Sequence, residues 1–175
     1  DLNIGMDHTQ FLGTSLEQIA MEKAGIIKQN TPVVIGETTP ETRMVFDAIA
    51  KEHNAPITFA EDHQQIISAE ATNKGMEYNT KSFGTIHGEL SGLYQEKNTN
   101  TILNAIQQLE NLGYMHPVKC QANTPCQNRE VQKGFSHVCS LTGLQGRWQK
   151  IGDAPLTICD TGHNVPGWIY LSEQL

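Results

Sequence analysis

Apolar residues occur along this chain in short buried-looking runs that alternate with stretches at helical spacing. Residues 2–6 predict the end of a buried strand, and residues 15–28 predict a helix with an apolar face. The run 33–35 lies between a proline and a glycine, and the run 56–60 has similar character. Both predict interior strands, joined through a helix over 40–53. This strand–helix–strand order predicts an α/β fold with a mainly parallel sheet.

The two clearest helices are expected to turn apolar residues toward the protein interior. The helix over 40–53 has Pro40 near its start. Its expected inward residues are Met44, Val45, Ala48 and Ile49. A second amphipathic helix is expected over 99–112, ended by Gly113. Its expected apolar positions are Ile102, Leu103, Ile106, Leu109 and Leu112.

The remaining segments predict strands, loops and shorter helices. Strands are expected over 64–69 and 81–90, with a turn at 73–75 between them. Residues 114–128 predict a surface loop. Further along, a short helix is expected over 130–139, a strand over 156–159 and a helix opening near Pro166. We expect two domains, residues 1–139 and 140–175.

Composition and charge narrow the class of protein. Of the 175 residues, 38% are hydrophobic and 18% charged, which supports a real core. The net charge is −7, with 12 Lys and Arg against 19 Asp and Glu, and no basic stripe occurs. Nucleic acid is therefore not an expected partner. An anion such as a nucleotide could still bind at a local site of backbone N–H groups, a few cations and a metal ion.

The cysteines and the apolar runs indicate the compartment. The four cysteines form no CxxC pair, so we expect reduced thiols in a cytoplasmic protein. No apolar run approaches the roughly 20 residues of a membrane span. The chain begins without methionine, and no GxxxxGK[ST] phosphate loop occurs in it. We expect such a loop upstream, in a longer parent protein.

Two polar residues near the start are candidates for metal chemistry. His8 follows the first expected strand, where α/β proteins bind ligands, and a neutral imidazole there can ligate a divalent metal. Lys23 precedes Ala24 and Gly25, small residues that allow close approach of a ligand. Taken singly, a core or capping histidine and a solvated lysine are the better interpretations; only the combination favours a site.

A second group of candidates lies further along the chain. Asp160 directly follows the expected strand 156–159, where a carboxylate commonly accepts hydrogen bonds from ribose hydroxyls, and His163 lies in the same loop. Arg147 could contact phosphate. Asn98 could cap the following helix or read an adenine edge. An Asx-turn at Asp160 with a surface arginine remains an equal alternative.

Five motifs in order resemble the folylpolyglutamate synthase/dihydrofolate synthase family of the Mur ligase superfamily. They are Asn3–Gly13 (NIGMDHTQFLG), Glu22–Lys28 (EKAGIIK), Tyr94–Asn98 (YQEKN), Gly143–Gln149 (GLQGRWQ) and Asp160–Asn164 (DTGHN). The first two are typical of Mur ligases generally, and the fourth favours the folate branch. The resemblance implies the C-terminal part of a P-loop-type central domain, followed by the start of a Rossmann-like C-terminal ligase domain.

The resemblance also implies roles for individual residues. His8 matches a magnesium-binding histidine, and Lys23 matches a lysine that becomes a carbamate and helps to hold the metal. Three residues match contacts to ATP: Asn98 near the adenine, Arg147 at phosphate and Asp160 near the ribose. His163 matches a catalytic residue beside the ATP. The chain departs from the family pattern at Tyr94, where many relatives have histidine, and at Thr161-Gly162 and Val165.

The implied activity is an ATP- and Mg²⁺-dependent ligase that adds L-glutamate to folate or dihydropteroate through an acyl phosphate. We expect a cytoplasmic monomer with no membrane partner, and we expect this chain alone to be inactive. Three alternatives stay open: a Mur-type ligase for a cell-wall precursor, a non-catalytic nucleotide-binding module, and a metal-dependent phosphohydrolase suggested by Asp7 and His8. The residues do not decide between first and later glutamate additions.

Overall fold

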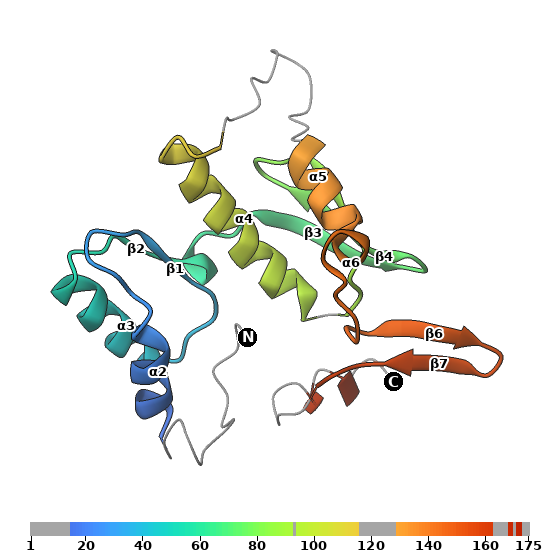
Figure 1. Cartoon of the computed structure of the whole chain (residues 1–175), viewed down its shortest axis with the longest axis horizontal. Helices are drawn as coiled ribbons and strands as arrows, with labels where there is room; N and C mark the ends of the chain where they lie inside the picture. Colours follow the sequence, from blue (N-terminus) through green and yellow to red (C-terminus); the bar gives the residue numbers. More distant parts are fainter. Residues whose placement is uncertain (1–14, 93, 116–128, 163–167, 170, 173–175) are drawn as a thin grey trace.

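The computed structural model describes residues 15–92, 94–115, 129–162, 168–169 and 171–172. A long central helix, α4, separates two groups of elements (Figure 1). On one side lie α2, α3, β1 and β2. On the other lie the sheet β3–β5 and helices α5 and α6, with the hairpin β6–β7 extending beyond the first turn of α4 (Figure 1). The strand expected over 2–6 and the helix start near Pro166 lie outside the described residues.

Helix α2 spans Leu16–Ala24 and begins with a reciprocal cap. The Ser15 hydroxyl accepts a hydrogen bond from the Gln18 N–H, and the Gln18 side chain accepts one from the Ser15 N–H. This arrangement satisfies two N–H groups that a helix start otherwise leaves unpaired. The helix ends at Gly25, earlier than the expected Lys28, because Gly25 weakens the last turn.

The predicted strand–helix–strand unit is confirmed. Strands β1 (Val33–Ile35) and β2 (Ile57–Phe59) pair in parallel, and α3 (Pro40–Glu52) connects them. Thr39 caps α3 directly before Pro40. Pro40 is tolerated there because the first helical N–H has no partner within the helix.

The predicted inward face of α3 is partly wrong. Met44 is 67% exposed and Ala48 is also exposed, whereas Thr42, Phe46 and Ala50 are buried. These three residues are spaced four apart and therefore share one helical face. The aromatic ring of Phe46 and the small Ala50 set the contact with α2, which the aliphatic pattern alone did not indicate.

Three antiparallel strands form the second sheet, where the pattern predicted two strands. They are β3 (Ile66–Thr72), β4 (Gly75–Thr80) and β5 (Thr85–Gly88), in the order β3-β4-β5. The predicted turn at 73–75 is confirmed between β3 and β4. A further tight turn follows β4, where the Thr80 hydroxyl donates to the Gly84 carbonyl at 2.7 Å. Of the strands that the structure describes, only β1 and β2 are parallel.

Helix α4 spans Gln95–Asn111 and begins four residues before the predicted Thr99. Its first turn is polar, so apolar periodicity does not reveal it. Among the expected apolar positions Leu103 is fully buried, but Ile102 is 42% exposed and Leu109 is 40% exposed. The rest of the buried face is polar: Gln95, Thr99, Asn100, Thr101 and Asn104.

Two asparagines on this face fasten α4 to its neighbours. Asn100 donates to the Ala60 carbonyl and accepts from the Gln65 N–H, both at 2.7 Å. Asn104 donates to the His63 carbonyl at 2.8 Å. The helix is thereby bound to the 3-10 helix η1 (Ala60–Asp62) and to the start of the β3–β5 sheet. Buried backbone groups require such partners, because leaving them unpaired costs free energy.

The C-terminal part contains two short helices and a hairpin. Helices α5 (Arg129–Ser136) and α6 (Val138–Thr142) replace the single helix expected over 130–139. Strand β7 (Leu156–Cys159) is confirmed, and it pairs antiparallel with β6 (Gln149–Asp153), which the pattern did not predict. The predicted domain boundary at 139/140 falls within α6 and stays a prediction. No helix among the described residues is long and apolar enough to cross a membrane.

Two hydrophobic cores flank α4. The first joins α2, α3 and the parallel strands; its buried residues are Ala20, Ala24, Ile27, Phe46, Ala50, Ala55 and Phe59. The second joins the β3–β5 sheet, α4 and α5; its buried residues are Ile66, Met76, Tyr78, Phe83, Ile86, Leu103 and Val131. Because α4 lies between the two cores, its orientation determines how the two groups of elements meet.

Replacing Asn100 with alanine should destabilise the protein by about 2–4 kcal/mol, because two buried backbone groups, the Ala60 carbonyl and the Gln65 N–H, lose their partner. Urea denaturation of the variant and the parent measures this difference. Asn111→Ala, an exposed change in the same helix, is the matched control and should stay within about 0.5 kcal/mol. Equal stability of the two variants would contradict the role of Asn100.

Candidate functional site

The structure places three of the predicted site residues around the first turn of α4. Asn98 lies on α4 itself, Arg147 lies in the loop that leads into β6, and Asp160 directly follows β7. Lys23 lies in the last turn of α2. The other two predicted residues, His8 and His163, lie outside the described residues.

Asp160 accepts hydrogen bonds from three separate groups. Its Oδ2 accepts from the Trp148 N–H at 2.7 Å and from the Tyr94 hydroxyl at 3.1 Å. Its Oδ1 accepts from the Gly162 N–H at 2.7 Å, which is the Asx-type turn considered as an alternative. Since a carboxylate offers about four acceptor positions, Oδ1 retains room for one further donor.

The loops on either side of the β6–β7 hairpin are fastened together beside Asp160. The Thr161 N–H donates to the Gly146 carbonyl at 2.9 Å, and Arg147 Nη1 donates to the Thr161 hydroxyl at 3.1 Å. Gly146 has φ +71°, and a Cβ there would lie 2.6 Å from the Thr161 methyl group. Only glycine fits this close approach. The guanidinium of Arg147 is therefore held beside Thr161 in a residue that is exposed.

Trp148 adopts a left-handed backbone conformation, with φ +48°. This region is unfavourable for a bulky residue that is not glycine. The Trp148 N–H points to Asp160 in this conformation, so the charge-assisted hydrogen bond offsets part of the cost. Strained backbone that a neighbouring charge holds in place is typical of functional sites.

Tyr94 connects this group to α4. Its hydroxyl donates to Asp160, and its carbonyl accepts from the Asn98 N–H at 3.4 Å. Asn98 Nδ2 also donates to Gln95 Oε1 at 3.3 Å, which keeps the amide at the start of the helix. Burial raises the pKa of Tyr94 above its ordinary value of 10.0, and the charge of Asp160 and the hydrogen bond to it raise it further. The phenol is therefore a protonated donor at neutral pH.

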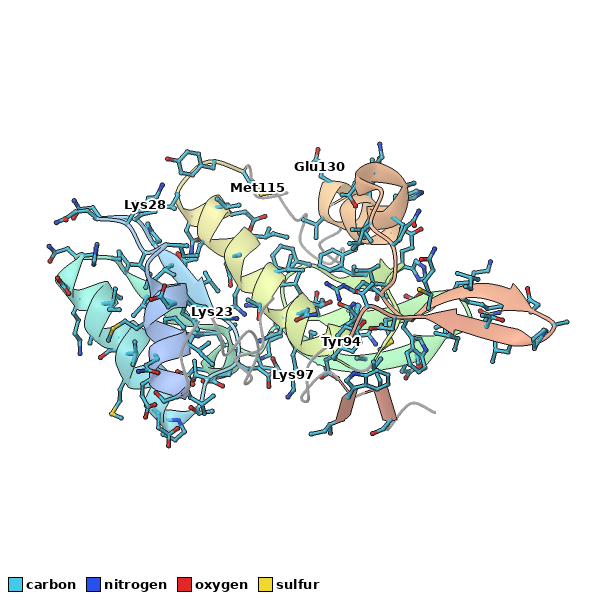
Figure 2. All side chains as sticks on the ribbon, turned by 60° about the horizontal axis from the view of Figure 1, so that its bottom comes forward. Lys23, Lys28, Tyr94, Lys97, Met115 and Glu130 are labelled. Atoms are coloured by element: carbon cyan, nitrogen blue, oxygen red, sulfur yellow. The ribbon has the colours of Figure 1, made fainter. Side chains whose placement is uncertain are left out.

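Lys23 is separated from this group by α4. In Figures 1 and 2, α2 lies on one side of α4 and the β6–β7 hairpin on the other. The Lys23 side chain is half-buried, and it pairs with no acidic side chain among the described residues. The part of the chain that the structure describes also contains no group of three His, Cys, Asp or Glu residues able to hold a metal.

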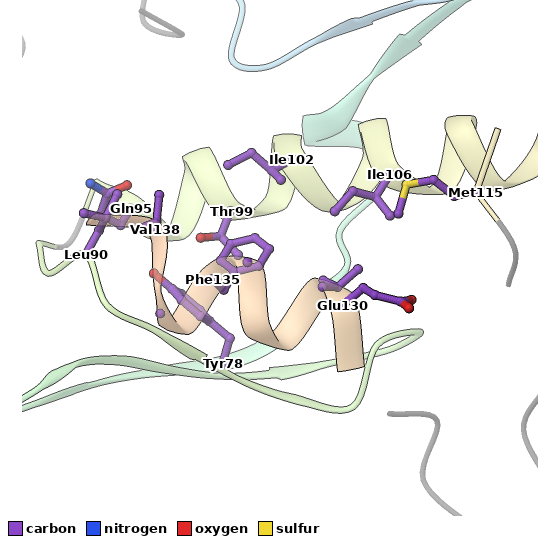
Figure 3. Close-up of a pocket in the computed structure, with 13 residues that line it drawn as sticks. Tyr78, Leu90, Gln95, Thr99, Ile102, Ile106, Met115, Glu130, Phe135 and Val138 are labelled. Carbon is purple, nitrogen blue, oxygen red and sulfur yellow. The ribbon is translucent and has the colours of Figure 1, made fainter. Parts of the chain in front are cut away.

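The described residues form a cavity against α4 and another beside the loop that carries Arg147. The larger, about 350 Å³, lies between α4, α5 and the β3–β5 sheet and has apolar walls that include Ile102, Ile106 and Phe135 (Figure 3). The smaller, about 260 Å³, is lined by Arg147, Lys74 and Lys150, among others. Only the smaller one has the cations that an anionic ligand requires.

Sequence reasoning missed several residues of this group. Tyr94 was noted only as a departure from the family pattern, and the backbone N–H of Trp148 has no signal in a sequence. Thr161 also belongs to this group through its hydroxyl, although the sequence indicated it only as a departure from the family pattern. The available signal was the glycine at position 146, next to the predicted Arg147, since such a residue often allows close backbone approach.

Comparisons with known proteins agree with the resemblance that the five motifs carry. No family model matches the chain. It is 28% identical over 177 residues to the dihydrofolate synthase/folylpolyglutamate synthase of Bacillus subtilis, covering 99% of this chain and 38% of that protein. The same-named protein of Haemophilus influenzae is 29% identical over 185 residues, again covering 99% of this chain and 38% of the relative. The chain therefore spans well under half the length of these relatives.

Solved structures show the same fold. A folylpolyglutamate synthase complex with AMPPCP and folate superposes with a TM-score of 0.76 at 22% identity, covering 98% of this chain and 41% of that one. The Mycobacterium tuberculosis folylpolyglutamate synthase complexed with ADP gives a TM-score of 0.73 at 24% identity, covering 97% of this chain and 36% of that one. The curated relatives confirm the resemblance to this family, and the solved structures confirm the α/β fold class.

Asp160→Asn should lower the pKa of Tyr94 but leave it above its ordinary value, because burial, the largest cause of the increase, remains. Ultraviolet difference titrations of the parent and the Asp160→Asn protein, each with its Tyr94→Phe counterpart subtracted, isolate this phenol. Because the pKa of Tyr94 is higher in the folded protein than in the unfolded chain, the protonated phenol contributes to the free energy of unfolding. This contribution is fully present below pH ~10 and is lost as the pH rises toward the folded-state pKa. An unchanged Tyr94 pKa would show that the two side chains are not in contact.

Proposed function

We propose that this chain is part of an ATP-dependent ligase that joins L-glutamate to folate or dihydropteroate. The relatives that cover 99% of the chain carry the name dihydrofolate synthase/folylpolyglutamate synthase, which supports a folate substrate. A structural neighbour that binds AMPPCP and folate supports the use of both compounds by one protein.

The observation that carries this proposal is the grouping of Asp160, Arg147 and Asn98 around the first turn of α4. The free acceptor position on Asp160 Oδ1 suits a ribose hydroxyl. The exposed Arg147 guanidinium, held at Thr161, suits a phosphate. The Asn98 amide, one helical turn beyond Tyr94, suits an adenine edge. His163, which follows in the same loop, would act beside the ATP as the catalytic partner of this group.

The proposed reaction has two steps that conserve atoms and charge. A carboxylate oxygen of the folate attacks the γ-phosphorus of ATP, and ADP leaves with the electrons of the broken bond. The glutamate amine then attacks the acyl carbon, an amide bond forms, a proton is lost and phosphate leaves. Positioning and charge neutralisation do most of the work in phosphoryl transfer, and Arg147 supplies both.

Lys23 is proposed to act as a carbamate. Its neutral amine adds to CO₂, an N–C bond forms and one proton is released, so that a cation becomes an anion. The half-buried side chain pairs with no acidic side chain among the described residues. Together with His8 it would hold Mg²⁺, which would reduce the repulsion between the γ-phosphate and the carboxylate. Among the described residues, no group of three His, Cys, Asp or Glu side chains could hold a metal by itself.

A Mur-type ligase for a cell-wall precursor is the alternative with the same mechanism, and a non-catalytic nucleotide-binding module is the alternative of another class. The names of the relatives favour the folate branch over both. A cytoplasmic monomer, inactive as the 175-residue chain alone, remains part of the proposal on the strength of the resemblance.

In the full-length protein in which we expect this chain to lie, Lys23→Ala should reduce folate-dependent phosphate release from ATP by about a hundredfold or more, because the variant loses a ligand for the Mg²⁺ that would offset the repulsion between the γ-phosphate and the carboxylate. The assay supplies magnesium, L-glutamate, and either dihydropteroate or tetrahydrofolate.

Lys28→Ala is the matched control, an exposed lysine of the same segment, and should leave the rate within about twofold. A cell-wall precursor with its own amino acid tests the competing ligase. Release only with that precursor would discard the folate assignment, and the absence of release with every substrate would favour the binding module.

A further inference from the structure

The hydrogen bond from Tyr94 to Asp160 joins two parts of the chain that lie 66 residues apart. Tyr94 is the residue before the first turn of α4, and Asp160 is the first residue after β7. The proposed nucleotide contacts come from both parts: Asn98 from α4, and Arg147 with Asp160 from the hairpin loops. The Tyr94 hydroxyl lies at the junction of the two.

The Tyr94 ring occupies a position that the backbone leaves open for it. Gly92 has φ +115°, and a Cβ there would lie 2.8 Å from Tyr94 Cε1, so the ring rests directly against the backbone of Gly92. The Gly92 carbonyl in turn accepts from the Gln95 N–H at 2.9 Å, which connects this turn to α4. The hydroxyl is therefore presented to Asp160 by a ring whose location is set by its surroundings.

The helix behind Tyr94 is itself anchored. Lys97 forms an ion pair with Glu37 of the segment between β1 and α3, and Asn100 binds the Ala60 carbonyl and the Gln65 N–H. On the other side, Asp160 holds the strained Trp148 through its N–H. A bond between Tyr94 and Asp160 therefore connects a rigid helix to the loop that carries Arg147.

We propose that Tyr94 is a positioning residue, whose hydroxyl holds Asp160 and the Arg147 loop against α4 so that the nucleotide contacts of both parts are aligned before ATP binds. This inference rests on the proposed nucleotide site. Because Oδ2 of Asp160 is occupied by Tyr94 and Trp148, the carboxylate is turned so that Oδ1 is the atom left for a ribose hydroxyl. Holding the site in its bound arrangement removes an ordering cost from binding.

The test uses the full-length protein and compares Tyr94→Phe with the parent. Phenylalanine keeps the ring against Gly92 and removes only the hydroxyl. Losing one hydrogen bond to a charged group should raise the KM for ATP roughly tenfold while kcat changes less than about twofold. Tyr94→His retains an N–H donor, so its KM for ATP should lie closer to that of the parent than the KM of Tyr94→Phe does.

Two controls separate positioning from general stability. Tyr114→Phe, at a tyrosine that is 79% exposed, should leave the KM unchanged. In a protein that already carries Asp160→Asn, Tyr94→Phe should raise the KM for ATP by a further factor of less than about two, because the hydrogen bond it removes is already weakened. A further tenfold increase in KM in the Asp160→Asn protein would overturn the proposal. An unchanged KM in the protein that carries Tyr94→Phe alone would also overturn it.

Hydrogen exchange of the ligand-free protein provides a readout that does not depend on activity. Tyr94→Phe should increase exchange several-fold at the Trp148 and Gly162 amides, which donate to Asp160, and not in α3. Unchanged exchange at these amides overturns the proposal. If the parent itself neither binds nor hydrolyses ATP, the proposed function fails; if the parent is active and only the Tyr94 effects are absent, this inference alone fails.

Discussion

The structure depends on one constraint: α4 turns polar side chains inward, and each of them needs a partner. Asn100 and Asn104 meet that need with the Ala60 and His63 carbonyls and the Gln65 N–H. Hydrogen bonds are directional, so they determine the position of α4 along its axis and its rotation more narrowly than apolar contacts do. The two hydrophobic cores then assemble on either side of a helix whose placement is already determined.

The candidate site uses the first turn of the same helix. Tyr94 and Asn98 stand at the start of α4, and the loops of the β6–β7 hairpin reach them through Asp160. The hairpin contributes little apolar burial of its own, since Ile151 and Leu156 are exposed. Its position relative to α4 therefore rests largely on polar contacts, among them the hydrogen bond from Tyr94 to Asp160.

Local preferences are broken where these polar contacts meet. Trp148 takes a backbone conformation that bulky residues avoid, and Gly146 is approached so closely that no side chain would fit. Both irregularities aim a donor at an acceptor: the Trp148 N–H at Asp160, and the Thr161 N–H at the Gly146 carbonyl. Departures from local rules tend to gather at functional positions, and here both lie within one of the five motifs, Gly143–Gln149.

The sequence by itself determined the elements whose signal is local. The unit β1–α3–β2, helix α2 and strand β7 directly before Asp160 all follow from spacing and apolar runs, and the five motifs indicate the family. Only the tertiary structure decided where α4 begins, which face of α3 is buried, and that β4 and β6 exist. It also decided that Tyr94 meets Asp160. Each of these depends on partners far away in the sequence, and a polar residue shows no sign of burial until the group that satisfies it is in place.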